Sequence, residues 1–194
     1  MPTQRLILGS SSPFRHELLA RLLLDFEAYS PDVDESPHPG ESPPDLVARL
    51  AADKARAVAR HFPDALVIGS DQVAVHGDAI VGKPHTHERA VAQLRAASGR
   101  VVTLYTGLVL LNAATGNLQS EVVPYRVHFR ELDDALIERY LRKEQPYHCA
   151  GSVRAEGLGI ALIERHEGDD PATLIGLPLI RLVRMLENEG VRVV

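Results

Sequence analysis

The stretch Ala65-Leu66-Val67-Ile68-Gly69-Ser70-Asp71 decides how this chain is expected to fold. Its first five residues are apolar or glycine, which is typical of a central strand buried on both faces. The run then ends abruptly in Ser70 and Asp71. Because ligands of open α/β sheets bind at the carboxyl ends of the strands, this stretch predicts a ligand site beside Asp71.

The segments on either side alternate between strand and helix patterns. Leu6 to Leu8 is a short apolar strand, and a helix from Pro13 to Leu24 follows, with Ser12 at its N-cap. The other expected elements are a loop at 32–44, helices at about 44–62, 86–97, 133–143 and 178–189, and strands at 101–111, 118–129 and 158–163. The strands 101–111 and 118–129 form a probable hairpin, so the pattern predicts an α/β fold around a mixed sheet.

Composition narrows the classes of function. The 194 residues are 45% hydrophobic, with no apolar run long enough to cross a bilayer. Cys149 is the one cysteine and the segment before Leu6 is too brief for a signal peptide, so we expect a cytoplasmic protein. The net charge of −5 argues against a binder of duplex nucleic acid. A free nucleotide remains possible, since it needs only a local basic pocket.

Three basic segments are candidates for phosphate binding. In Gly9 to Arg15, small hydroxyl residues precede a helix N-terminus and Arg15 offers a planar fork; the alternative is an N-capped turn with a surface arginine. Lys54 lies on the apolar row of its helix, where a cation needs an anionic partner unless it extends to solvent from the edge. Lys83, in Gly82-Lys83-Pro84, can reach a phosphate as a point charge, although the same residues occur in exposed turns.

Two carboxylates are candidates for metal binding or water activation. Asp71 ends the buried run and Glu35 lies in the acidic loop, and their hard oxygens suit Mg²⁺ better than zinc. The alternatives are a capping role for Asp71 and a solvated loop around Glu35. The phosphate-loop motif of NTPases and zinc-ligand spacings are absent from the sequence, and Cys149 is more typical of a packing residue than of a nucleophile.

Taken in order, these segments resemble the Maf family of nucleoside triphosphate pyrophosphatases over almost the whole chain. The matching stretches are Leu6 to Ser10 and on to Arg15, Asp32 to Glu35, Lys54-Ala55, Ile68 to Asp71, Gly82 to Pro84, Thr106-Gly107 and Gly176 to Pro178. The resemblance implies one Maf/ITPase-like domain over residues 1–194. That domain would be two-lobed, with helices packed on an elongated, twisted mixed sheet, and homodimers are common.

The resemblance also implies roles for individual residues. Asp71 would be the catalytic base and would hold a divalent metal, Mg²⁺ or Mn²⁺, with Glu35. The triphosphate of a nucleoside triphosphate would be bound by Ser10, Arg15, Lys54 and Lys83. The metal and the cations would neutralise phosphate charge while water is positioned for attack.

Three residues depart from the commonest family pattern. Phe14 stands where many members have a second arginine, Gln72 where they have threonine, and Glu156 where they have glutamine. This combination is similar to the branch that acts on 7-methyl-GTP, whose cationic base could be attracted by Phe14 and hydrogen-bonded by Glu156. The alternatives are the dTTP/UTP branch and a non-catalytic nucleotide-binding regulator of cell division.

Overall fold

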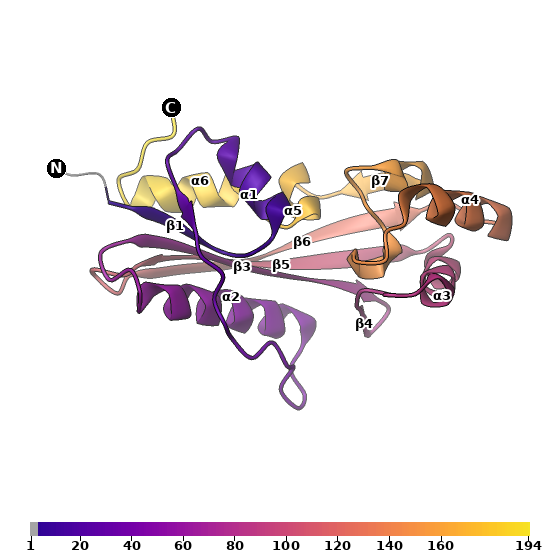
Figure 1. Ribbon diagram of the computed structural model, residues 1–194, viewed down its shortest axis with the longest axis horizontal. Helices are drawn as coiled ribbons and strands as arrows, with labels where there is room; N and C mark the ends of the chain where they lie inside the picture. Colours follow the sequence, from indigo (N-terminus) through magenta and orange to yellow (C-terminus); the bar gives the residue numbers. More distant parts are fainter. Residues whose placement is uncertain (1–3) are drawn as a thin grey trace. The chain divides into compact units, whose positions relative to one another are not determined.

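The computed structural model of the protein describes residues 4–194. Residues 1–3, part of the N-terminal segment considered above, lie outside the described residues. The strands are β1 (Leu6–Gly9), β2 (Glu27–Ala28), β3 (Leu66–His76), β4 (Ala79–Val81), β5 (Val101–Asn112), β6 (Leu118–Phe129) and β7 (Ile163–Glu167). The helices are α1 (Pro13–Ala20), α2 (Pro43–Ala59), α3 (His87–Ala97), α4 (Asp134–Glu144), α5 (Pro171–Ile175) and α6 (Leu179–Asn188), with two short 3-10 helices, η1 (Ala150–Ser152) and η2 (Leu158–Leu162) (Figure 1).

The strands form a mixed sheet, as the sequence predicts. Its order is β2-β1-β3-β5-β6-β7, with β4 pairing to β3. β1 is parallel to β2 and β3, whereas β4 is antiparallel to β3 and β7 is antiparallel to β6. The chain divides into two compact units: unit 1 contains the residues up to Gln72, Thr106–Val123 and Asp170–Val194, and unit 2 contains Val73–Tyr105 and Pro124–Asp169.

Unit 1 has three layers. Alternate residues of a strand point to opposite faces, so Leu8 and Ile68 pack in the cluster that includes residues of α1 and α6, whereas Ile7 and Val67 pack in the cluster that includes residues of α2. Figure 1 shows α2 on one face of β1 and β3, with α1 and α6 on the other. By the same alternation, Asp71 faces the layer of α2.

Two glycines let α2 lie directly on the sheet. A Cβ atom added to Gly69 of β3 would lie 2.1 Å from the carbonyl oxygen of Ala51, and one added to Gly107 of β5 would lie 2.1 Å from that of Val47. Any larger residue would therefore push the helix away. This close contact sets the distance between α2 and β3 at the level of Asp71.

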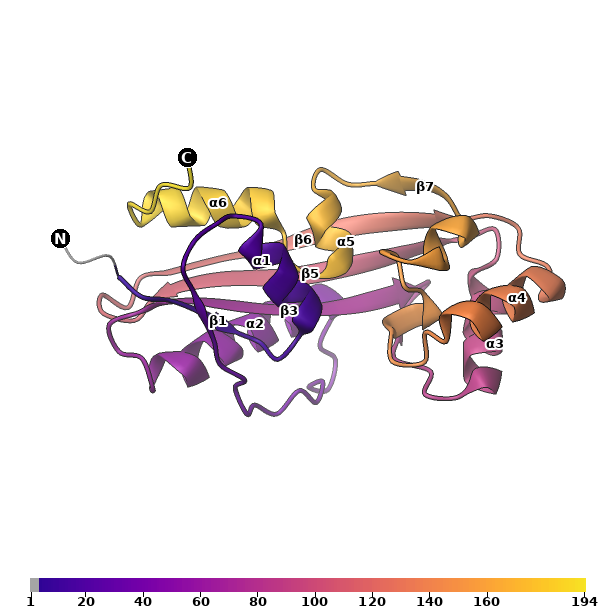
Figure 2. The ribbon, with the colours of Figure 1, turned by 45° about the horizontal axis from the view of Figure 1, so that its top comes forward.

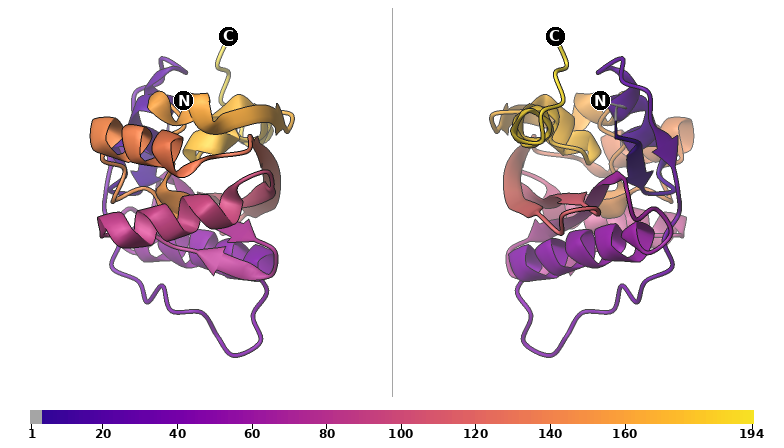
Figure 3. Two further views of the ribbon diagram at one scale, coloured as in Figure 1. Left: turned by 90° about the vertical axis from the view of Figure 1, so that its right-hand side faces the viewer. Right: turned by 90° about the vertical axis from the view of Figure 1, so that its left-hand side faces the viewer.

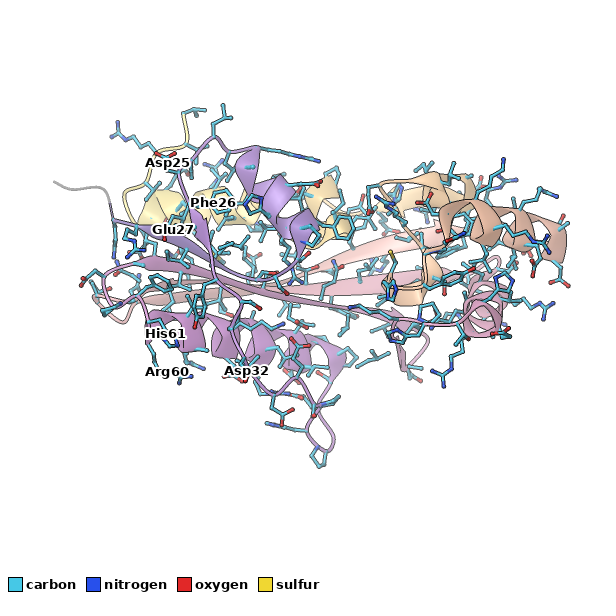
Figure 4. The ribbon with its side chains drawn as sticks, viewed as in Figure 1. Asp25, Phe26, Glu27, Asp32, Arg60 and His61 are labelled. Carbon is cyan, nitrogen blue, oxygen red and sulfur yellow. The ribbon has the colours of Figure 1, made fainter. Side chains whose placement is uncertain are left out.

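The segment that carries the acidic residues crosses the edge of unit 1. Phe26 packs with the cluster on the α6 face, and Tyr29 stacks on His61 and Phe62 at the end of α2. Figure 4 shows Phe26 beside α6, Asp32 beside α2, and His61 at the end of α2. The loop from β2 to α2 consequently continues on the α2 side of the sheet (Figure 2, Figure 3).

Unit 2 is built on the distal parts of β3, β5 and β6. Its antiparallel pairs include Ala74 with Val81 and Arg126 with Glu167. The helices α3 and α4 pack against each other, as the left view of Figure 3 shows. Their buried faces include Ala90, Leu94, Ile137 and Leu141.

Several sequence predictions of element boundaries were wrong. Residues 158–163 form mainly a 3-10 helix and not a strand, because the carboxylate of Glu144 accepts the backbone N–H of Leu158, and the apolar side chains of Leu158 and Ile160 are exposed. The strand begins only at Ile163. The first helix ends at Ala20, before Leu23, which has a positive φ of 55° and is 92% exposed. Within the described residues, we find no helix with the length and apolar character to cross a membrane.

Asp71 lies inside β3, and not at the end of a strand as the sequence predicted. The prediction failed because Ser70, Asp71 and Gln72 interrupt the apolar pattern without interrupting the strand. The parallel partner β1, however, ends at Gly9, which pairs with Gly69. Asp71 therefore lies just beyond the carboxyl end of β1, which is the position where parallel sheets bind ligands.

Candidate active site

Lys54 lies between two carboxylates in unit 1. Its Nζ atom is 2.6 Å from Oδ1 of Asp71 and 2.6 Å from Oε1 of Glu35. The side chains of Lys54 and Asp71 are 10% and 12% exposed, whereas that of Glu35 is 61% exposed. The buried cation therefore has the anionic partners that a position on the apolar face of α2 requires. Its alternative reading, a lysine that extends to solvent, is wrong.

The three charges leave the cluster with one excess negative charge. In the part of the chain that the structure describes, Oδ2 of Asp71 has no hydrogen-bond partner. A water molecule can bind this oxygen, and a carboxylate with one oxygen fixed by Lys54 and the other free is well placed to orient that water.

Arg49 of α2 anchors the loop that carries Glu35. Its Nη2 donates to the carbonyl oxygen of Ser36 at 3.0 Å, and its Nε lies 2.6 Å from Oε1 of Glu41. The hydrogen bond from Arg49, together with one from the backbone N–H of His38, lowers the pKa of Glu41 to about 2. The loop is thus tied to α2 beside Glu35, although the sequence gave no reason to single out Arg49.

Ser10 and Arg15 meet beyond the end of β1. The Oγ atom of Ser10 accepts the backbone N–H of Ser12 at 3.1 Å and lies 3.4 Å from Nη1 of Arg15. Ser12 is the N-cap of α1, as predicted, and accepts the N–H of Arg15. Burial lowers the pKa of Arg15, while the negative charges of Asp71 and Glu35 raise it. Arg15 therefore lies within electrostatic reach of the carboxylate cluster.

The neighbours of Asp71 on β3 face the other layer of unit 1. Ser70 donates to the carbonyl oxygen of Gly176 at 3.1 Å. Nε2 of Gln72 donates to Oγ1 of Thr106 and to the carbonyl oxygen of Thr173, each at 2.7 Å. The amide nitrogen of Gln72 thus ties β3 to β5 and α5. Sequence reasoning assigned no role to Ser70 or Thr173, and the one available signal was the position of Ser70 next to Asp71.

Glu35 and Asp71 suit a hard divalent cation. Both carboxylates converge on a single cationic atom, Nζ of Lys54. Among residues 4–194, no three or more His, Cys, Asp and Glu side chains form a group that could hold a metal. Mg²⁺ is usually held by one or two carboxylates, with water and substrate phosphates completing its coordination. The donor set fits an ion of this kind, with Glu35 and Asp71 as the protein ligands.

Two of the predicted site residues belong to unit 2. Lys83 is exposed and follows Gly82, whose carbonyl oxygen accepts a hydrogen bond from Nε2 of Gln93 at 3.0 Å. Glu156 lies 3.2 Å from Nε of Arg154, which also contacts Glu144 at 3.3 Å. Each residue is therefore described by its neighbours in unit 2. The remaining specificity candidate, Phe14, is a half-buried residue of α1 in unit 1.

The chain belongs to the Maf-like protein family, whose sequence model matches residues 5–189. This family assignment agrees with the resemblance seen in the sequence. Among its relatives, a protein of Pseudomonas syringae pv. tomato is 62% identical over 188 residues, which cover 97% of this chain and 98% of the relative. A protein of Nitrosococcus oceani is 60% identical over 185 residues, which cover 95% and 93% of the two chains. Both relatives are named 7-methyl-GTP pyrophosphatase.

Proposed function

We propose that the protein hydrolyses 7-methyl-GTP to 7-methyl-GMP and pyrophosphate. The observation that carries the proposal is the cluster of Lys54, Asp71 and Glu35, which joins a buried cation, a partly free carboxylate and a potential metal ligand. The names of the two relatives support the substrate. In the reaction, Asp71 accepts a proton from water as its oxygen bonds to the α-phosphorus, and the bond to the α–β bridging oxygen breaks with its electron pair leaving on pyrophosphate.

The proposed substrate-binding residues supply positive charge and hydrogen-bond donors. Arg15 and Ser10 would bind phosphate oxygens beyond the end of β1, and Lys54 would hold Asp71 in its ionised form. We propose that Lys83 also contributes charge to triphosphate binding. Mg²⁺ or Mn²⁺, when bound by Glu35 and Asp71, would neutralise phosphate charge.

The reaction is tested with a panel of purified triphosphates: 7-methyl-GTP, GTP, UTP and dTTP, with Mg²⁺ or Mn²⁺. We expect monophosphate and pyrophosphate, with the highest kcat/KM for 7-methyl-GTP. Asp71→Asn should lower kcat by about 10²- to 10⁴-fold, which is the usual contribution of a general base. Asp134→Asn is the matched control, since Asp134 forms an exposed ion pair with Arg95. Faster hydrolysis of UTP or dTTP would favour the pyrimidine branch, and binding without pyrophosphate release would favour a regulator.

The preference for the methylated purine is assigned to Glu156, Phe14 and Gln72. Glu156 can accept hydrogen bonds from the Watson–Crick edge of guanine, and the face of Phe14 can attract a cationic base. Glu156→Gln should therefore reduce the ratio of kcat/KM for 7-methyl-GTP to that for UTP. An unchanged ratio would contradict this role.

The remaining proposals concern the whole protein. We propose that residues 1–194 act as one catalytic domain, that the protein forms a homodimer in the cytoplasm, and that duplex nucleic acid is not a partner. Analytical ultracentrifugation at micromolar concentration tests the dimer, and a sedimentation coefficient of a monomer would contradict it.

A further inference from the structure

The carbonyl oxygen of Gly176 is shared by two donors of unit 1. It accepts a hydrogen bond from Nε of Arg15 at 2.9 Å and one from Oγ of Ser70 at 3.1 Å. Ser70 is fully buried, so its hydroxyl cannot reach solvent or a bound nucleotide directly. The hydroxyl can, however, hold the carbonyl group that fixes one edge of the Arg15 guanidinium.

The backbone at Gly176 gives this carbonyl its direction. Gly176 ends α5 with a φ of 119°, which side chains other than glycine rarely adopt. A Cβ atom at this position would also lie 3.4 Å from Nε of Arg15. Glycine therefore allows the carbonyl to face Arg15 at close range.

The helix that presents Gly176 is itself fixed to the sheet. The carbonyl oxygen of Thr173 accepts hydrogen bonds from Nε2 of Gln72 and from Oγ1 of Thr106. At the other end of α5, the carboxylate of Asp170 accepts the backbone N–H groups of Ala172 and Ile180, each at 2.8 Å. The carbonyl of Gly176 is thus a fixed point against which Arg15 can be oriented.

We propose that Ser70 and the carbonyl of Gly176 are positioning groups for Arg15. With Nε engaged by Gly176, the guanidinium presents its terminal nitrogens toward Ser10, and Nη1 lies 3.4 Å from Oγ of Ser10. These nitrogens form the edge that binds phosphate oxygens in pairs. Ser70 thereby acts on substrate through Arg15, while its neighbour Asp71 acts on water from the opposite face of β3.

The inference rests on the proposed role of Arg15 and is tested by a double-mutant cycle. The variants are Ser70→Ala, Arg15→Ala and both together, assayed for KM and kcat with 7-methyl-GTP and for binding of inorganic pyrophosphate by calorimetry. Ser70→Ala should weaken pyrophosphate binding and raise KM by about three- to tenfold, the scale of one hydrogen bond, with kcat changed less than about twofold. In the Arg15→Ala background, Ser70→Ala should have no further effect on either quantity.

Each result of the cycle has one meaning. Equal effects of Ser70→Ala with and without Arg15 would overturn the inference, as would an unchanged pyrophosphate affinity. If Arg15→Ala itself left KM unchanged, the proposed role of Arg15 would fail with it. Ser98→Ala is the matched control, because the hydroxyl of Ser98 also bonds to the backbone, accepting the N–H of Leu132 at 2.7 Å. Should Ser70→Ala fail to fold, Ser70→Cys retains the volume with a weaker donor, and the same loss of effect without Arg15 is expected.

Discussion

Units 1 and 2 each contain a cation between two carboxylates, but with opposite exposure. In unit 1 the cation, Lys54, is 10% exposed and the carboxylate of Glu35 is 61% exposed. In unit 2 the cation, Arg154, is 46% exposed and the carboxylate of Glu144 is 10% exposed. The open carboxylate of unit 1 can bind a further cation, whereas the closed carboxylate of unit 2 accepts the backbone N–H of Leu158 at 2.7 Å and holds a turn. The same three charges thus serve chemistry in one unit and structure in the other.

Removing the two cations should separate these roles most clearly. Lys54→Met leaves Asp71 without its buried partner, and we expect a loss of about 3 kcal/mol in the free energy of unfolding. It should also lower kcat/KM for 7-methyl-GTP by about 10²- to 10³-fold. Arg154→Met, at an exposed ion pair, should change the free energy of unfolding by about 1 kcal/mol or less. Urea denaturation and steady-state kinetics measure both variants, and equal losses would remove the distinction.

The contact between α2 and β3 offers a second way to test the difference. Gly69→Ala should reduce the free energy of unfolding by about 2–3 kcal/mol, because the new methyl group would overlap the carbonyl of Ala51 and displace the helix that carries Lys54. Gly82→Ala is the control, since no atom lies within 4 Å of its added Cβ, and we expect a change within about 0.5 kcal/mol. Similar melting curves for the two variants would contradict the close packing.

Neutralising one carboxylate of each unit should produce crossed effects. Glu35→Gln should lower kcat/KM by about tenfold, equivalent to about 1.4 kcal/mol, with little change in the unfolding free energy because Glu35 is exposed. Glu144→Gln should lower the unfolding free energy by about 1–2 kcal/mol through weaker bonding to Leu158 and Arg154. Its kcat should remain within about threefold of the wild type. A large loss of kcat in Glu144→Gln would show that its role is more than structural.

The smallest expected effect concerns the thiol of Cys149 in unit 2. Burial, followed by the charge of Glu156, raises the pKa of Cys149 above its ordinary value of 9.0. Since thiolate is the reactive form, iodoacetamide should modify the native protein more slowly at pH 8 than the unfolded chain. The raised pKa leaves stability unaffected well below pH 9.0 and lowers it as the pH rises past that value. Glu156→Gln should speed alkylation a few-fold, and a slower reaction would contradict the assigned cause.

Local pattern was sufficient to predict most of unit 1. The runs Leu6 to Leu8 and Ala65 to Gly69 predicted the parallel pair at its centre, and the apolar row of α2 placed Lys54 on the buried face. These predictions succeeded because strand and helix periodicity record which face of each segment is buried. The irregular region of unit 2 was harder, since the turn at Leu158 depends on the distant carboxylate of Glu144.

The partners of the candidate site could not be read from periodicity. Arg15 and Ser70 reach Gly176 across 161 and 106 residues, and no local spacing encodes such contacts. Gly176 entered the sequence comparison only as part of a matching stretch without a role. Likewise, the interaction of Glu35 with Lys54 became visible only when the path of residues 25–32 around the edge of unit 1 was known.

The distance along the chain between Arg15 and Gly176 has a consequence for biosynthesis. A ribosome releases Arg15, Lys54 and Asp71 early, but the carbonyl that orients Arg15 leaves the exit tunnel only when translation is nearly finished. N-terminal segments can begin to fold during synthesis, yet here the phosphate-binding edge would stay unfinished until termination. We therefore expect nascent chains stalled before Gly176 to bind pyrophosphate weakly, so that nucleotide hydrolysis begins only with the released polypeptide.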